Sequence, residues 1–392
     1  MTQRLLFTSA SVMLGHPDKL CDRISDALVD THLAIDPEAR VSAEVAAAGQ
    51  VFFLVTDVAF RGEVDITGVV RRTIAETGYF PKDIDADRCA ILAQSSSMGP
   101  PWVRTALPVE ESPEDKAAME QTTVFGYACS DTQELMPLPI LVAHRLCGSI
   151  EGLVLRHAIP GLGPDGEVQV TVEYIDQKPA RIDTIVIQVQ HSGDPKPLRE
   201  ELTALAIDPV FQKLQIAPDQ TTRVIVNPAG PFEAGGPARD AGLTGRKNAD
   251  DTYGGAARHG GHALSGKDPS RLDRSASYAA RHVAANVVAA GLARECELML
   301  SYSIGESRPT TVSARTFGSG VLPDERLSVI IGELFDLRPA AIEKRLRLRL
   351  LPKERGGSFY RKLAVGGHFG RTELDPPWEK LDMVEQLRSA DY

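Results

Sequence analysis

The chain has 392 residues, long enough for two or three domains with substantial cores. Its 43% hydrophobic and 24% charged residues are typical of a globular protein, and a net charge of −10 argues against a nucleic-acid-binding domain. The five cysteines show no C-x-x-C spacing, which disfavours a disulfide framework or zinc site and suits a reducing cytoplasm. Without an apolar leader or a run of about 20 apolar residues, the sequence predicts a cytoplasmic protein with no membrane segment.

The first informative stretch is GHPDKLCDRISDALVD, residues 15–30. Pro17 fits the first turn of a helix, which places Gly15 and His16 in the loop before the helix N-terminus. Free N–H groups and the helix dipole make such a terminus suitable for phosphate, and Asp18 could hold a hard metal ion there. We expect three later carboxylates of this helix to be solvated, namely Asp22, Asp26 and Asp30.

The next elements lead to a long connection without periodicity. The apolar run 51–60 predicts a strand, and the amphipathic run 66–78 predicts a helix that ends at a glycine. Residues 95–122 follow and are rich in proline and charge. A connection of this length inside a compact domain is usually functional, so we predict a mobile active-site lid. The alternative is a disordered linker.

The middle and C-terminal parts mix strands and helices. Strands are predicted at 167–174, 181–190, 223–227 and near 297–304, and helices near 197–206, 270–290 and 325–336. The elements do not follow a strict strand–helix–strand alternation, which favours an α+β fold over a doubly wound sheet. The layout suggests three modest subdomains.

A glycine-rich segment, residues 235–275, carries the second candidate site. The stretch from Gly235 to Gly266 holds nine glycines, which allow close approach of the backbone to a ligand. They alternate with cations that can hold phosphate and with carboxylates that can hold magnesium or ribose hydroxyls. The run GHALSGK resembles a P-loop, but Asp268 follows it and no buried strand precedes it, so we reject that interpretation. The residues alone indicate a magnesium-dependent enzyme or binder of a nucleoside polyphosphate.

These motifs resemble the methionine adenosyltransferase family, also called S-adenosylmethionine synthetase. The resemblance rests on residues 15–30, on 124–146, on the whole 235–304 block, and on GHFGR and PPWEKLD near the end. It implies three interleaved α+β subdomains with pseudo-threefold symmetry, divided at about 1–123, 124–232 and 233–392. It also implies a homodimer, sometimes paired into a homotetramer, with active sites at the dimer interface.

The resemblance further implies a two-part reaction. The sulfur of L-methionine attacks C5′ of ATP and displaces tripolyphosphate, which the enzyme then hydrolyses to diphosphate and phosphate. Both parts need charge neutralisation on the phosphates, which cations and magnesium supply. Two Mg²⁺ ions per site and one K⁺ ion are expected as cofactors.

The resemblance assigns residue roles. His16, Arg246 and Lys267 would be catalytic, and Asp18 and Asp273 would bind magnesium, while Glu44 matches a potassium ligand. The ATP and phosphate contacts would come from His16, Asp165, Asp240, Arg246, Lys247, Ala263 and Lys267.

The predicted acceptor pocket departs from the family pattern. Its residues would be Asp57, Glu120, Met98, Asp240 and Arg271. Asp57 replaces a glutamate, Glu120 an aspartate, Arg271 a lysine and Met98 a glutamine. An amino acid could still be held at both ends, since arginine binds carboxylates bidentately. The altered pocket leaves open a different amino acid or thioether as acceptor.

The phosphate side departs more seriously. Glu167 stands where the family has a lysine and Pro231 where it has an arginine, and two such losses motivate a third alternative, a catalytically silent regulatory paralogue. Two unit charges about 4 Å apart interact by roughly 4 kcal/mol at an effective dielectric near 20, so a glutamate that faced the phosphates in place of a lysine could abolish the chemistry. Arg239 and His262 stand at positions that are small in the family, and we hypothesise that they compensate.

Overall fold

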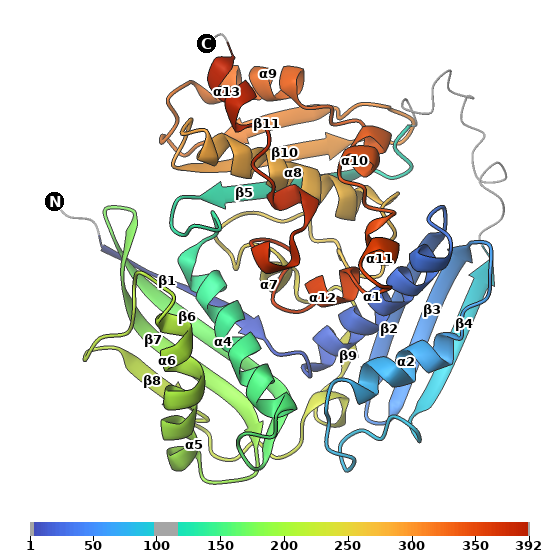
Figure 1. Ribbon diagram of the computed structural model, residues 1–392, viewed down its shortest axis with the longest axis vertical. Helices are drawn as coiled ribbons and strands as arrows, with labels where there is room; N and C mark the ends of the chain where they lie inside the picture. The colour runs from blue at the N-terminus through green and yellow to red at the C-terminus, as the bar shows by residue number, and fades with distance from the viewer. Residues whose placement is uncertain (1–3, 98–116, 391–392) are drawn as a thin grey trace.

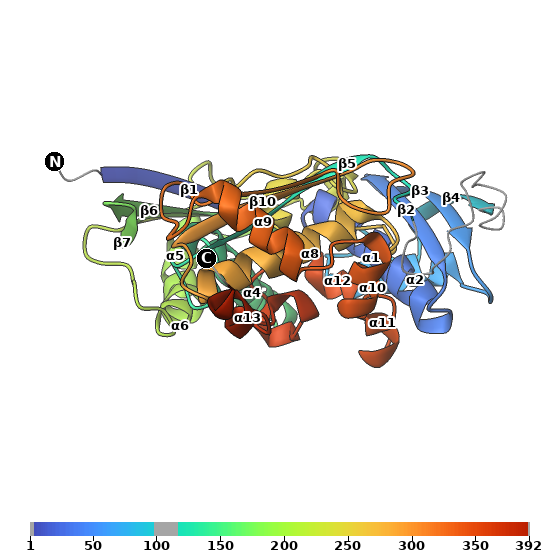
Figure 2. The same ribbon diagram turned by 90° about the horizontal axis from the view of Figure 1, so that it is seen from above.

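The computed structural model describes residues 4–97 and 117–390. The expected α+β class is confirmed: in the described chain, three sheets carry helices and surround the middle of the molecule (Figure 1). Figure 2 shows the strands toward the upper side and most helices toward the lower side. The predicted lid 95–122 falls largely outside the described residues, and so does Met98.

The central sheet has the order β1-β6-β7-β8. Its strands are β1 (Arg4–Val12), β6 (Leu162–Ile175), β7 (Lys178–His191) and β8 (Arg223–Val226). Helices α4 (Leu138–Leu155), α5 (Pro195–Leu202) and α6 (Asp208–Phe211) pack against it. Helix α4 is apolar and long enough to cross a membrane, but 67% of it is buried inside the fold, as expected of a core helix.

The second sheet has the order β4-β3-β2-β9. Its strands are β2 (Arg40–Ala48), β3 (Val51–Ala59), β4 (Ala90–Ser97) and β9 (Gly242–Leu243). Helices α1 (Pro17–Ile35) and α2 (Ile66–Ala75) cover the inner face. Buried and more exposed residues alternate along β2 and β3, so this sheet has one face turned away from the core.

The third sheet has the order β11-β10-β5. Its strands are β5 (Thr122–Cys129), β10 (Glu295–Tyr302) and β11 (Thr311–Arg315), and its helices include α8 (Leu272–Ala289) and α9 (Asp324–Leu334). The short helices are α7 (Asn248–Asp251), α10 (Pro339–Arg345), α11 (Leu351–Glu354), α12 (Tyr360–Leu363) and α13 (Val384–Ser389).

The three units exchange strands, which gives the interleaving that the resemblance implies. The first strand of the chain, β1, pairs with β6 in the central sheet. The short strand β9 comes from the glycine-rich segment and pairs with β2 in the N-terminal sheet. Its position ties the C-terminal part of the chain to the helix that begins after His16.

Candidate active site

His16 caps the N-terminus of α1. Its Nδ1 accepts a hydrogen bond from the backbone N–H of Asp18 at 3.2 Å, so the ring proton of the neutral imidazole lies on Nε2. Burial and the nearby Lys247 ammonium lower the pKa of His16 to about 4. A neutral ring whose Nε2–H can donate beside a helix N-terminus is suited to a phosphate oxygen.

Asp18 lies in the first turn of α1 and is 2% exposed. Its Oδ1 accepts from the backbone N–H of Leu243 at 3.0 Å, and its Oδ2 accepts from Lys247 Nζ at 2.7 Å. The Arg246 guanidinium lies 3.5 Å from Oδ1. Burial opposes ionisation, but the Lys247 hydrogen bond and charge together with the Leu243 N–H outweigh it and lower the pKa of Asp18, so the carboxylate is charged.

Asp273, in the first turn of α8, repeats this arrangement. Its Oδ1 accepts from the Thr122 hydroxyl at 2.7 Å, and its Oδ2 accepts from Lys267 Nζ at 2.6 Å. The residue is 6% exposed, and against the cost of burial the Lys267 charge and the hydrogen bonds from Lys267 and Thr122 together lower its pKa. Thr122 could not be predicted as a partner of Asp273, because the two residues lie far apart along the chain.

The edge of β2 sets the distance between the Asp18–Lys247 pair and the Asp273–Lys267 pair. Leu243 pairs with Ala46, and Lys267 forms a bridge with Ser42 on the same edge. Four residues of strand separate these backbone positions by about 13 Å. Ala263 brings the stretch around Gly245 into contact with the stretch before Lys267, since a Cβ built on Gly245 would lie only 2.4 Å from the Cβ of Ala263. The glycine-rich segment thus forms one wall that carries Arg246, Lys247 and Lys267.

The other carboxylates of α1 hold this wall, so the expectation that they are solvated is wrong. Asp22 accepts from the backbone N–H of Gly245 at 2.8 Å, and Asp26 accepts from that of Gly266 at 2.9 Å. Asp30 accepts from three successive backbone N–H groups at the start of α12, in residues 359–361. All three are fully buried because backbone N–H groups, of the glycine-rich segment for Asp22 and Asp26 and at the start of α12 for Asp30, replace water as their hydrogen-bond donors.

Buried cations compensate the charge of these carboxylates. Lys19 pairs with Asp22 and Asp251, and Arg274 pairs with Asp26. The two cationic side chains are fully buried. Removing either partner would leave an uncompensated charge in the interior.

Two predicted acceptor residues contact each other. Glu120 accepts from Arg271 Nε at 2.6 Å and from the backbone N–H of Asp273 at 3.1 Å. Asp57 lies on β3, where Ser96 donates to its carboxylate at 3.2 Å. Its register partner Ser42 forms the bridge to Lys267, so Asp57 approaches the same end of the wall.

The remaining predicted ligands of ATP differ in exposure. Asp165 is buried and accepts from the backbone N–H of Gly236 at 2.8 Å, and burial raises its pKa to about 6. Asp240 is exposed beside Arg239, and its carboxylate accepts from the next backbone N–H. Asp165 therefore fixes the start of the glycine-rich segment, whereas Asp240 remains accessible to a ligand.

The departures on the phosphate side have structural counterparts. The Glu167 carboxylate accepts from Gln169, two residues further along β6, at 3.0 Å. The Arg239 guanidinium lies over the Phe232 ring at 3.8 Å, directly after exposed Pro231. Arg239 also lies close enough to Asp165 to oppose the rise of its pKa. A cation therefore stands near the position where the family arginine is missing.

The residues fit magnesium. No cluster of three or more potential ligand side chains occurs in the described residues, and Asp18 and Asp273 offer one ionised carboxylate each. Mg²⁺ is usually bound in this way in phosphate sites, through one or two carboxylates together with water and substrate oxygens. Glu44 is exposed on the outer face of β2, next to Val55 of β3.

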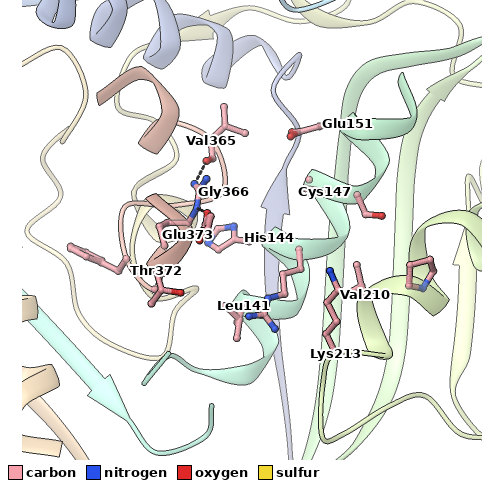
Figure 3. A pocket seen from close by; sticks show the side chains of 17 residues that line it. Leu141, His144, Cys147, Glu151, Val210, Lys213, Val365, Gly366, Thr372 and Glu373 are labelled. Carbon is pink, nitrogen blue, oxygen red and sulfur yellow. Dashed lines mark hydrogen bonds and ion pairs between the residues drawn. The ribbon is translucent and has the colours of Figure 1, made fainter. Parts of the chain in front are cut away.

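A separate cavity of about 550 Å³ lies between α4, α6 and residues 365–373 (Figure 3). Figure 3 shows His144 between α4 and the C-terminal segment and Glu151 at the far end of α4. Glu151 accepts from the backbone N–H of Leu14 at 2.7 Å. None of the predicted site residues lines this cavity, but Glu151 contacts the loop that presents His16.

Comparison with known proteins decides the family. Residues 4–100, 115–232 and 234–380 match the N-terminal, central and C-terminal domain models of S-adenosylmethionine synthetase. The chain belongs to the S-adenosylmethionine synthetase family. It is 46% identical to the S-adenosylmethionine synthases of Synechococcus sp. (strain JA-3-3Ab) and Thermosynechococcus vestitus, with 99% of this chain and 98% of each relative covered. The synthase of Acaryochloris marina is 44% identical over 100% of this chain and 98% of its own.

Within this family member, the carboxylates that contact the wall share one feature of the sequence, their regular spacing along α1. The spacing Asp18, Asp22, Asp26 and Asp30 places four carboxylates on one stripe of α1. Asp18 and Asp22 accept from Leu243 and Gly245, and Asp26 from Gly266. The spacing shows that these carboxylates share one face of the helix, and the fold shows that this face meets backbone N–H groups.

Proposed function

We propose that this chain is an ATP:L-methionine S-adenosyltransferase, which releases diphosphate and phosphate by way of tripolyphosphate. The observation that carries the proposal is the pair of aspartate–lysine contacts, Asp18–Lys247 and Asp273–Lys267, on one glycine-rich wall. Carboxylates for a divalent cation and cations for phosphate alternate there, as a leaving tripolyphosphate requires. The near-full-length similarity to S-adenosylmethionine synthases supplies the nature of the acceptor.

Each residue then has a definite task. His16 donates from Nε2–H to the phosphate oxygens next to C5′, and Arg246, Lys247 and Lys267 neutralise the tripolyphosphate as the C5′–O bond breaks. Asp18 and Asp273 would hold two Mg²⁺ ions, which supply further neutralisation when bound. Asp240 contacts the nucleoside. The fixed backbone of the wall keeps these groups in place without reorganisation during the reaction.

The methionine is held by groups at the Asp273 end. Glu120 would accept from its ammonium group and Arg271 would bind its carboxylate, after their mutual ion pair opens. Asp57 would be a second acceptor for the ammonium group. These side chains set the spacing between the two ends of the amino acid and so determine which acceptor fits.

The chain would act as a homodimer, possibly paired into a homotetramer. The outer face of the β4-β3-β2-β9 sheet exposes large apolar side chains, and such a patch favours a protein partner. They are Val51, Phe53, Val55, Leu92 and Leu243. Glu44 shares this face and would bind K⁺. Five unpaired cysteines agree with a cytoplasmic location.

Mass analysis of the products from ATP, Mg²⁺ and L-methionine tests the proposal. S-adenosylmethionine is expected, and a panel of other thioethers and amino acids should give less product. A better acceptor in the panel would replace methionine in the proposal. If ATP binds but neither product formation nor tripolyphosphate hydrolysis occurs, the chain is a silent paralogue. In that case a gain of turnover in Glu167→Lys would identify Glu167 as the lesion.

A further inference from the structure

The two aspartates of the site share a detailed pattern of contacts. In each carboxylate a neutral donor holds Oδ1, namely the Leu243 N–H for Asp18 and the Thr122 hydroxyl for Asp273. In each, a lysine ammonium holds Oδ2, at 2.7 Å and 2.6 Å. The neutral donor fixes the orientation of the carboxylate, and the lysine occupies the oxygen that a metal ion would take.

Each lysine is therefore committed to a carboxylate in the ligand-free chain. Lys247 and Lys267 are partly exposed, with side-chain exposures of 28% and 15%, while their partners are almost buried. Asp18 has a second cation nearby, but the Arg246 guanidinium is half-exposed and lies 3.5 Å from Oδ1, so Lys247 remains the close partner of Oδ2. A nearly buried carboxylate without a close counter-charge is costly, so loss of the lysine is unfavourable until another cation replaces it. A divalent ion that arrives alone must displace an ammonium group with no anion present to receive it.

We propose that Lys247 and Lys267 are place-holding counter-ions that couple metal binding to polyphosphate binding. When metal ions and a polyphosphate arrive together, one ion would replace Lys247 at Asp18 and a second ion would replace Lys267 at Asp273, and each released ammonium group would bind a phosphate oxygen. Every charge stays paired before and after this exchange. Either ligand alone leaves one charge unpaired, so each binds weakly without the other. The inference depends on the proposed function only in taking tripolyphosphate as the anion.

The exchange predicts that removing either lysine raises the affinity of the site for a metal ion on its own. In Lys247→Met or Lys267→Met, Oδ2 of one aspartate loses its internal cation. Mn²⁺ alone, followed by electron paramagnetic resonance, should then bind about tenfold more tightly than to the unsubstituted chain. Tripolyphosphate presented with Mg²⁺ should bind more weakly, since one phosphate partner is missing.

Controls separate this effect from general charge changes. Lys213 forms no ion pair within the described residues, and Lys213→Met should leave Mn²⁺ affinity unchanged. Adding Asp18→Asn to Lys247→Met should abolish the gain. The inference is overturned if both methionine variants bind Mn²⁺ no more tightly than the unsubstituted chain, or if the Lys213 control gains equally.

A measurement on the unsubstituted chain covers the case of variants that do not fold. Calorimetric titration with metal-free tripolyphosphate should show at least about tenfold weaker binding than titration with the preformed magnesium complex. Equal affinities would refute the exchange. Because neither experiment measures product, a chain that binds as described but forms no S-adenosylmethionine would contradict the proposed function alone.

Discussion

The Asp26 carboxylate accepts a hydrogen bond from the backbone N–H of Gly266 at 2.9 Å, and the same carboxylate pairs with the Arg274 guanidinium. Asp26 and Arg274 have no exposed surface. Lys267 directly follows Gly266, so a buried acid in α1 fixes the backbone from which the lysine proposed to bind phosphate extends. The position of the glycine-rich wall therefore depends on buried contacts with α1.

Removing the Asp26 carboxylate should destabilise the fold strongly. Asp26→Ala leaves Arg274 as an unpaired buried charge, and we expect a loss of about 3–5 kcal/mol in the free energy of unfolding. Urea denaturation measures it. The matched control is Glu385→Gln, which breaks the exposed Glu385–Arg388 ion pair and should cost less than about 1 kcal/mol. Equal losses in the two variants would contradict the role assigned to Asp26.

Two glycines with the same backbone conformation should respond differently to alanine. Gly266 (φ +80°) would place a Cβ 2.1 Å from the carbonyl oxygen of Ala43, whereas Gly261 (φ +78°) has open space around its Cβ position. Gly261→Ala should cost only the backbone strain of about 1–2 kcal/mol. Gly266→Ala should cost more and should also displace Lys267. The free energy of unfolding and the ATP affinity are measured for both variants. Similar values in the two variants would show that the contact of Gly266 with β2 is unimportant.

Glu151 should make stability depend on pH. Burial raises its pKa from an ordinary value near 4.5 to about 7, so between these pH values the folded chain binds more protons at this site than the unfolded chain. The contribution of Glu151 to the free energy of unfolding should fall as pH rises through this window, by at most about 3 kcal/mol. Relative to the unsubstituted chain, Glu151→Gln should therefore gain stability from pH 5 to pH 8 in urea titrations. A difference that stays constant with pH would refute this.

Arg239 tests whether a gained cation compensates for Pro231 and Glu167. Arg239→Ala removes the guanidinium over Phe232, and we expect ATP affinity to fall about tenfold. Arg315→Ala is a matched control, because Arg315 lies over Phe317 at 4.5 Å outside the glycine-rich segment. Equilibrium binding of ATP measures both variants. An unchanged affinity in Arg239→Ala would rule out compensation.

The sequence predicted the positions of helices and strands better than the contacts between distant segments. Strand 51–60 and helix 270–290 are confirmed as β3 and α8 within a few residues, because their apolar periods are strong. The position of His16 before the helix followed from Pro17. The pairing of β1 with β6 was not predictable, since strand pairing depends on contacts far apart in the sequence.

The error at Asp22, Asp26 and Asp30 has a physical cause. An i, i+4 row of carboxylates looks the same whether its hydrogen-bond donors are water or backbone. Only the tertiary fold brings the N–H groups of Gly245 and Gly266 to them. For the same reason, the pairing of each candidate metal ligand with a lysine could not be read from the chain.

The most direct test of the central claim is the fate of the oxygen that bridges C5′ and the α-phosphorus of ATP. In the proposed reaction, the tripolyphosphate departs whole with this oxygen as the C5′–O bond breaks. With ATP labelled there with ¹⁸O, and with Mg²⁺ and L-methionine, the label should appear entirely in the diphosphate and phosphate products. Label retained as the 5′-oxygen of a released nucleoside would mean that a phosphorus–oxygen bond was broken instead, and would contradict the proposed displacement at C5′.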